Sequence, residues 1–410
     1  MSSCSQSEDT SDLQSSVQIP VEFGSYTSKS VQTRGGYAGA MGNEQLQSQG
    51  FGVIAYYTEG SEYADGLTPN FMYNQKVSGS DWSYTPVKYW PNEAQNGDVD
   101  NQSPAATAEA ADKLSFFAYA PYTDVTVTSG AVTENADYGI TAITSNAASG
   151  DPKITYVAST DLSKQVDLLW GTVNSEVTTW KNVIGTQTLT EGLPYKDLIK
   201  PTISQKVKFS FRHALSKFQL QVVGAFDQVG EGGTLEDGTK VTIEKVEISN
   251  IGGGTKGVLN LNNTTAKVPL WETAEGSEKV SMTIEGDALN PDLKYEGKQV
   301  QTVDGVTAEE QHLLATEDDA LLIIPTSGET AEDVTVKITY YVTTADANLA
   351  AGYSQVQNVI TKTISDLKLE GGKAYNLKLI LGLTEVKFEA TVEDWEDGSE
   401  TEVNLPINVE

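Results

Sequence analysis

Apolar and polar residues alternate with a period of two along much of the chain, which is the pattern of strands with one buried face. Clear alternating runs occur at 207–211, 218–222, 334–340 and 375–379. Two other runs, 51–57 and 116–119, are almost continuously apolar. Turn sequences such as Gly150-Asp151-Pro152 separate the runs, and candidate amphipathic helices are few. The pattern predicts an all-β fold built from antiparallel sandwiches.

The character of the chain changes near residue 200. A first half that is rich in Tyr and Trp ends there, and regular alternation begins at Val207. A chain of 410 residues is long enough for two or three domains. We therefore expect a polar tether over residues 1–16, an N-terminal β-sandwich domain over 17–200 and a C-terminal β-sandwich domain over 201–410.

The charge balance restricts the possible partners. The chain has 27 basic and 57 acidic residues, a formal net charge of −30 at pH 7. Such a chain repels the phosphates of nucleic acids and anionic lipid headgroups, which argues against both as partners. Two histidines and one cysteine are too few for most zinc sites, thiol redox motifs or disulfide scaffolds. We therefore expect no metal and no cofactor.

The motifs that could carry chemistry are weak. Gly252, Gly254 and Gly257 match the dinucleotide-binding pattern, but the residues after them alternate like a strand where that site needs a helix. His213 stands at the end of an alternating run, away from any nucleophile motif. We therefore expect no enzyme. A hydrolase with paired carboxylates stays a weaker alternative, because a sequence does not show the distance between two carboxylates.

Aromatic residues cluster at Trp82, Tyr84, Tyr89 and Trp90. Such rings stack on sugars in some proteins, but more often they fill a core or pack beneath a loop. Core packing is the favoured interpretation of this cluster. The alternative function is a surface lipoprotein that binds glycans and does not polymerise.

The single cysteine, Cys4, lies near the start of the chain. Two small residues, Ser2 and Ser3, precede it, as at the end of a lipoprotein signal peptide, where the cysteine becomes the acylated N-terminus. The polar stretch after it includes Glu8 and Asp9, and early acidic residues resemble the surface-export signal of lipoproteins in gut and oral Gram-negative anaerobes. We predict lipidation at Cys4, which would place an outer-membrane lipoprotein at the cell surface, with the lipid as its only membrane contact.

Several strings along the chain resemble one family. They are IPVEFGSY at 19–26, FGVIAYY at 51–57, LSFFAYAPY at 114–122, FRHALSKFQLQV at 211–222, GGKAYNLKLIL at 371–381 and FEATVEDW at 388–395. Taken in order, they resemble the fimbrillin family, the type V pilin-like lipoproteins of gut and oral Gram-negative anaerobes. The resemblance implies two tandem transthyretin-like antiparallel β-sandwich domains. It also implies a structural or tip subunit of a fimbrium, or pilus, that serves cell adhesion and biofilm formation without catalysis.

The resemblance further implies assembly by protease-triggered strand exchange, in which a neighbour's strand replaces an N-terminal strand. The removable strand would be about 17–27, with Ile19, Val21 and Phe23 facing the core, and cleavage by an arginine-specific protease would follow Arg34. The candidate donor strands are Val386, Phe388, Ala390 and Val392, and then Val403, Leu405 and Ile407. The implied partners are other pilin subunits, identical or different, and a ligand on a host or bacterial surface.

Overall fold

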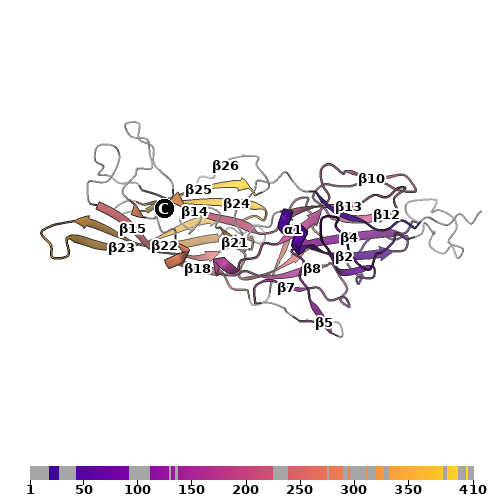
Figure 1. Ribbon diagram of the computed structural model, residues 1–410, viewed down its shortest axis with the longest axis horizontal. Coiled ribbons are helices and arrows are strands. Elements are labelled where there is room, and N and C mark those ends of the chain that lie inside the picture. Colours follow the sequence, from indigo (N-terminus) through magenta and orange to yellow (C-terminus); the bar gives the residue numbers. More distant parts are fainter. Residues whose placement is uncertain are drawn as a thin grey trace, which may run out of the picture.

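The structure is a computed structural model, and it confirms the prediction of an all-β fold. It describes residues 18–26, 43–91, 111–128, 131–133, 137–224, 239–274, 277–289, 294–295, 311–312, 320–326, 332–381, 386–395 and 403–404. The helical elements among them are α1 (Asn43–Gln49) and the single 3-10 turns η1 (Leu162–Lys164) and η2 (Gly286–Ala288). No helix in this described part of the chain is long and apolar enough to cross a membrane. The molecule is elongated, with the N-terminal half at one end and the C-terminal half at the other (Figure 1).

The first sheet has seven strands and forms the middle layer of the N-terminal half. Its order is β1 (Phe23–Tyr26), β13 (Val207–His213), β9 (Leu169–Thr172), β4 (Lys113–Ala120), β2 (Phe51–Thr58) and β3 (Met72–Val77), with β12 (Tyr195–Ile199) also paired to β4. In β2, Phe51 and Val53 face one core, whereas Ile54 and Tyr56 face another. Burial on both faces is the physical reason for the continuous apolar runs in the sequence.

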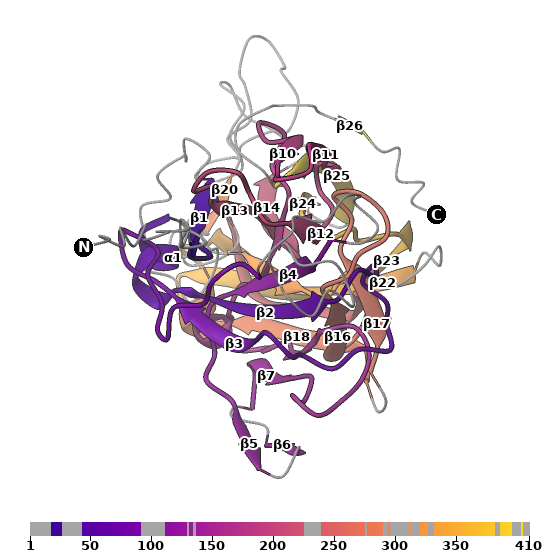
Figure 2. The ribbon, with the colours of Figure 1, turned by 90° about the vertical axis from the view of Figure 1, so that its right-hand side faces the viewer.

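Different elements cover the two faces of the first sheet. On one face lie α1, the segment 82–90 and the small hairpin of β10 (Thr179–Lys181) and β11 (Thr186–Thr188). On the other face lies a four-stranded sheet with the order β17 (Leu270–Thr273), β16 (Lys256–Asn260), β8 (Lys153–Val157) and β7 (Gly139–Ile143). Figure 2 shows β10 and β11 above the first sheet and β7 below it. A further hairpin joins β5 (Thr126–Thr128) to β6 (Ala131–Thr133).

The C-terminal half is a sandwich of two sheets. One sheet has the order β20 (Gln311–His312), β14 (Ser216–Gly224), β24 (Lys373–Leu381), β25 (Val386–Asp394) and β26 (Val403–Asn404), with β21 (Leu321–Ile323) also paired to β14. The other has the order β18 (Val280–Glu285), β15 (Thr239–Ile251), β22 (Glu332–Ala345) and β23 (Tyr353–Leu367), with β19 (Lys294–Tyr295) paired to β15. The predicted alternation is confirmed in β22, where Val334, Val336, Ile338 and Tyr340 are all buried in the core between the sheets.

Strand pairing runs in both directions. Most pairs that the structure describes are antiparallel, as expected, but β1 pairs in parallel with β13 and β14 pairs in parallel with β24. The residues after Gly257 form strand β16 rather than a helix, so the glycines at 252–257 do not open a dinucleotide site. The tandem transthyretin-like description of the two halves stays a prediction.

The sheets also cross the boundary that we expect near residue 200. Strand β13 lies in the first sheet, and β16 pairs with β8, so elements from 207 onward complete the N-terminal half. Only Ala214 and Leu215 separate β13 from β14, and both residues are buried in the core that the four-stranded sheet covers. The division into domains at 200 stays a prediction, while the pairing itself ties the two halves together.

Candidate assembly site

The segment 18–26 lies between two other parts of the chain. On one side β1 pairs with β13, from Phe23 opposite Val207 to Tyr26 opposite Ser210. On the other side the backbone around Pro20 bridges to Tyr89. The Val21 amide donates to the Lys88 carbonyl at 2.8 Å, and the Trp90 amide donates to the Ile19 carbonyl at 2.9 Å. The segment therefore joins two pieces of backbone that do not pair with one another here.

The side chains of this segment fill the core on that face of the sheet. Val21 and Phe23 are fully buried, and Ile19 packs against the same cluster. The Phe23 ring lies within 5.3–6.5 Å, centroid to centroid, of four other aromatic rings, those of Phe51, Tyr84, Phe116 and Phe209. Burying a phenylalanine side chain contributes about 1.5–3 kcal/mol. The segment is thus a structural part of the core, although it lies at the margin of the sheet.

Polar contacts hold the same segment in register. Glu22, its only charged residue, accepts a hydrogen bond from the Ser204 hydroxyl, and its carbonyl accepts from the Val207 amide at 2.8 Å. The Tyr84 hydroxyl donates to the Val21 carbonyl at 2.8 Å, and burial raises the pKa of this tyrosine, so it remains a neutral donor. A Cβ at Gly24 would lie 3.0 Å from Cγ of Lys208, so a glycine lets that lysine stem pack closely against the strand.

The aromatic cluster at 82–90 forms the wall against which the segment lies. The Trp82 ring packs on Phe51 at 5.5 Å, and Trp90 is only 4% exposed, between Phe116 and Trp180. Tyr89 alone is well exposed, at 47%. The core-packing interpretation is therefore right for Trp82, Tyr84 and Trp90. The sequence did not show that these rings enclose the N-terminal segment.

The candidate donor residues that the structure describes lie on two strands, which differ in how many residues pair with a neighbouring strand. Strand β25, which carries positions 386, 388, 390 and 392, pairs along all nine residues with β24. Within the described residues, strand β26 pairs with β25 through Val403 and Asn404. Val392 packs against the C-terminal core. Leu405 and Ile407 lie outside the described residues, as do Cys4 and Arg34.

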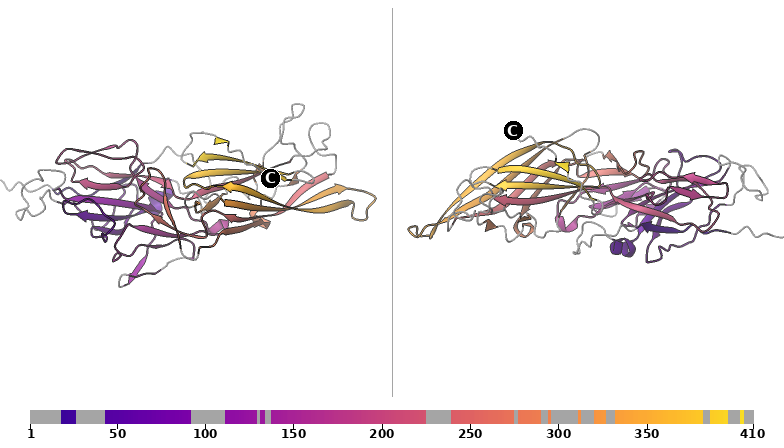
Figure 3. Two further views of the ribbon diagram at one scale, coloured as in Figure 1. Left: turned by 180° about the vertical axis from the view of Figure 1, so that it is seen from behind. Right: turned by 90° about the horizontal axis from the view of Figure 1, so that it is seen from above.

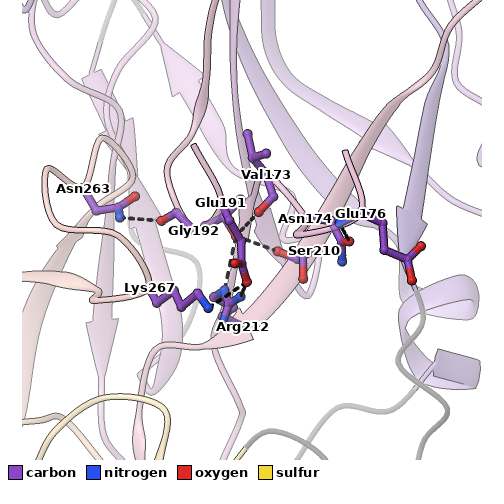
Figure 4. A network of polar contacts seen from close by, with 10 residues as sticks. Val173, Asn174, Glu176, Glu191, Gly192, Ser210, Arg212, Asn263 and Lys267 are labelled. Carbon is purple, nitrogen blue, oxygen red and sulfur yellow. Dashed lines mark hydrogen bonds and ion pairs between the residues drawn. The ribbon is translucent and has the colours of Figure 1, made fainter. Parts of the chain in front are cut away.

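A polar network connects β13, the strand beside the candidate site, to the loop between β16 and β17 (Figure 4). Glu191 accepts from Arg212 on β13 at 3.2 Å and from the Lys267 ammonium at 2.8 Å. The carbonyl of Gly192 accepts from the Lys267 amide at 3.0 Å and from the Asn263 amide group at 2.9 Å. Gly192 has φ +76°, and a Cβ there would lie 2.5 Å from the Lys267 nitrogen, so this close approach requires glycine.

His213 has a structural environment. Its Nδ1 lies 2.8 Å from Oδ2 of the buried Asp167, and its ring stacks on Trp395 with centroids 3.7 Å apart and planes 9° apart. The Trp395 amide also donates to the Gly372 carbonyl at 3.0 Å. The sequence analysis missed this cluster, which joins the end of β13 to the end of β25. In the part of the chain that the structure describes, no group of three or more His, Cys, Asp or Glu residues could hold a metal ion.

The fold and the site define a β-sandwich protein in which the N-terminal segment 18–26 completes the core and pairs with both β13 and the backbone at 88–90. Residues 40–395 match the model of the fimbrillin-like family, and the chain belongs to this family. The resemblance of the sequence strings is thereby confirmed. Family membership gives the protein a fimbrial or adhesion role at the cell surface.

Solved structures are similar to this chain, and one with a TM-score above 0.5 has the same fold. A fimbrial protein from Bacteroides vulgatus has a TM-score of 0.59 and 20% identity, covering 92% of this chain and 99% of its own. A putative cell adhesion protein from Bacteroides uniformis has a TM-score of 0.39 and 15% identity, covering 92% and 98%. A fimbrial assembly protein from Parabacteroides distasonis has a TM-score of 0.33 and 10% identity, covering 94% and 99%. A search of curated proteins found no match.

Proposed function

We propose that this protein is a fimbrial subunit that assembles by strand exchange. An arginine-specific protease cleaves after Arg34, the segment 18–26 leaves, and a C-terminal segment of a neighbouring subunit takes its place. The polymer contains identical or different subunits, is tethered through a lipid on Cys4 to the outer membrane, and serves adhesion and biofilm formation. The adhesion ligand is a molecule on a host or bacterial surface.

One observation carries the proposal. The segment 18–26 supplies fully buried residues to the core, and along the chain it connects to α1 only through residues 27–42, which contain Arg34. Cleavage there would leave the segment attached by noncovalent contacts alone. Its departure would expose Phe51, Phe116 and Phe209 to water and leave the outer edge of β13 unpaired, and both changes favour binding of a new strand.

The pairing of the C-terminal strands favours a particular donor. Strand β25 would have to break its whole ladder with β24 to leave, whereas β26 has only two paired residues. Val403, Leu405 and Ile407 also carry the alternation that a core-facing strand needs, as do Ile19, Val21 and Phe23. We therefore take residues 403–407 as the donated strand, and β25 stays in its own sheet.

The test combines cleavage with a donor peptide. The purified chain is treated with an arginine-specific endoprotease, and mass spectrometry locates the cut. The only other arginine, Arg212, is 9% exposed, so cleavage after Arg34 should dominate. A labelled peptide of residues 401–410 is expected to bind the cleaved protein and not the intact one, and larger species should appear on size-exclusion chromatography.

Two controls sharpen this experiment. The Arg34→Ala variant should resist cleavage and should not bind the peptide. A peptide carrying Leu405→Asp and Ile407→Asp should fail to bind the cleaved protein, because its core-facing positions are charged. A cleaved protein that neither binds the native peptide nor forms larger species would refute strand exchange for this chain.

A further inference from the structure

The hairpin of β22 and β23 projects from the C-terminal end of the molecule. It extends beyond the sandwich at the pole opposite the N-terminal half, in each of the side views (Figures 1 and 3). The two strands pair from Glu332 opposite Leu367 to Ala345 opposite Tyr353. Hydrogen bonds close the tip, where the Asp346 amide donates to the Gly352 carbonyl at 2.9 Å and the Gly352 amide to the Leu349 carbonyl at 2.8 Å. The hairpin is therefore a regular, well-paired element.

The outer strand of this hairpin lacks the usual protection of a sheet edge. Strand β23 is the last in its sheet, and in the described structure it pairs only with β22. Natural edge strands are usually protected by charges, prolines or bulges. Here no charged residue and no proline occurs between Asp346 and Lys362, in a chain with a net charge of −30.

Apolar side chains are concentrated on the same element. Nine large hydrophobic residues are exposed among the described residues, and four of them lie on this hairpin: Leu349, Tyr353, Val356 and Val359. Val356 is the most exposed of the four, at 59%. The Val356 side chain lies on the same face of the sheet as Ile338 and Tyr340, which are buried, but the opposite sheet does not bury Val356. A concentration of this kind indicates an interaction surface.

The sequence of the exposed strand reads alike in both directions. Residues 353–359 are Tyr-Ser-Gln-Val-Gln-Asn-Val. The order of residue types is symmetric about Val356: a glutamine lies on each side of it, then a polar residue, then an apolar residue. In an antiparallel pair related by a two-fold axis, residues equally distant from the centre lie opposite one another. With the axis at Val356, Tyr353 would face Val359, Gln355 would face Gln357, and Val356 would face its own copy.

We propose that β23 is a docking edge for a second copy of this chain, paired antiparallel about a two-fold axis at Val356. The pairing extends the five-stranded sheet of β18, β15, β22, β23 and β19 across two molecules, and it opposes apolar to apolar and amide to amide. Outside the symmetric segment, Lys362 of each copy faces the tip of the other, whose one charged residue is Asp346. The contact uses neither residues 18–26 nor the C-terminal tail, so it is independent of the proposed strand exchange.

Charge supports a second copy as the occupant. Two molecules with a net charge of −30 repel one another over most of their surfaces. The symmetric segment 353–359 itself contains no charged residue, so pairing of two copies there places no like charges of that segment opposite one another. The Gln357 side chain in this segment already has partners within its own chain. It donates to the Tyr341 hydroxyl and to Glu244, both at 3.0 Å.

The test measures self-association of the intact chain, without protease. Sedimentation equilibrium at about 0.15 M salt should show a monomer–dimer equilibrium. Val356→Lys places two like charges opposite one another and should raise the dissociation constant at least about tenfold. Val268→Lys is the matched control, because Val268 is 50% exposed but far along the chain from the hairpin, and it should leave the equilibrium unchanged. Circular dichroism should show that both variants are folded.

A mixing experiment tests the two-fold axis itself. Val356→Lys and Val356→Glu should each be monomeric alone, and an equimolar mixture should form a heterodimer, because opposite charges then meet at the axis. A wild-type chain that stays monomeric up to millimolar concentration would overturn the proposal. So would a dimer that Val356→Lys leaves intact, or a mixture that stays monomeric while Val356→Lys alone disrupts the wild-type dimer.

Discussion

At the scale of single residues, Phe23 is the side chain of segment 18–26 that packs against the most aromatic rings in the candidate assembly site. It contacts rings from β2, β4 and β13 as well as Tyr84, so it connects the N-terminal segment to three strands of the first sheet. Pilin-like exchange needs such a residue to be tightly packed before cleavage and replaceable afterwards. In the proposed strand exchange, a replacing strand would have to fit the aromatic wall around Phe23 rather than a polar site.

Replacing Phe23 by alanine should therefore weaken the intact protein. The expected loss is about 3–5 kcal/mol in the free energy of unfolding of the N-terminal half, since a large buried ring leaves a cavity. Urea denaturation followed by tryptophan fluorescence measures it. Tyr89→Ala is the control, because that ring is half exposed, and it should change stability by less than about 1 kcal/mol. Equal effects of the two changes would contradict the role of Phe23.

A second prediction at this scale concerns Asp197. Burial raises the pKa of its carboxyl, whose Oδ1 accepts from the Tyr63 amide at 2.7 Å, and its backbone has φ +57°. A carboxyl with a raised folded-state pKa stabilises the fold most below its unfolded pKa of about 3.9, and this contribution is lost as the pH rises through the folded pKa. Asparagine accepts the same hydrogen bond and tolerates this φ.

Asp197→Asn should accordingly gain stability relative to the wild type as the pH rises from 4 to 7. Melting temperatures of both proteins across that range give the difference directly. A difference for Asp197→Asn that does not vary with pH would show that its carboxyl does not titrate as described.

At the scale of elements, the strands differ in how firmly they are attached. Strand β1 is short but buries aromatic side chains, β25 is long and fully paired, and β26 is held by two residue pairs. Strand exchange needs one strand that leaves only after cleavage and one that leaves easily. In the proposed exchange, β1 is the strand that leaves after cleavage, and β26 belongs to the donated strand.

Ending the chain at Trp395 tests this difference. Removing residues 396–410 deletes β26 but keeps β25, Trp395 and the stacking on His213. The loss of stability should be only about 1–2 kcal/mol, the scale of one or two ladder hydrogen bonds. Ending the chain at residue 385 instead removes β25 and exposes the edge of β24, and it should unfold the C-terminal sandwich. Thermal unfolding of the two truncated chains decides between these outcomes.

At the scale of the whole molecule, shared cores join the two halves. One core contains residues from the first sheet and the four-stranded sheet together with Ala214, Leu215 and Leu322. The Glu191 network adds charged hydrogen bonds between β13 of the first sheet and the loop that joins β16 to β17. In the proposed polymer, a shared close-packed core would transmit force from one end of each subunit to the other.

Glu191→Ala should weaken the contact between β13 and the loop that joins β16 to β17. Arg212, whose side chain is 11% exposed, loses its carboxylate partner, and the expected cost is about 1–3 kcal/mol. Glu272→Ala removes an ion pair of which both side chains are well exposed, and it should cost no more than about 1 kcal/mol. Calorimetry of both variants measures the two losses. Equal losses would show that the Glu191 network stabilises the protein no more than an exposed ion pair does.

Local order in the sequence determined much of the fold. The side-chain period of two determined which residues of β22 and β24 face the core, because successive side chains on a strand point to opposite faces. Continuous apolar runs likewise marked β2 and β4, which are buried on both faces. Even the core role of the aromatic cluster at 82–90 followed from residue type alone. The family strings carried the rest of the identification.

Long-range pairing was decided only by the tertiary structure. No local pattern shows that β1 pairs in parallel with β13, that β8 pairs with β16, or that Trp395 stacks on His213. Each of these contacts joins segments far apart in sequence, and many partners satisfy the same alternation equally well. The sequence by itself therefore determined strands, faces and family, whereas the tertiary structure decided which strands meet, because pairing depends on how the whole chain packs its apolar faces together.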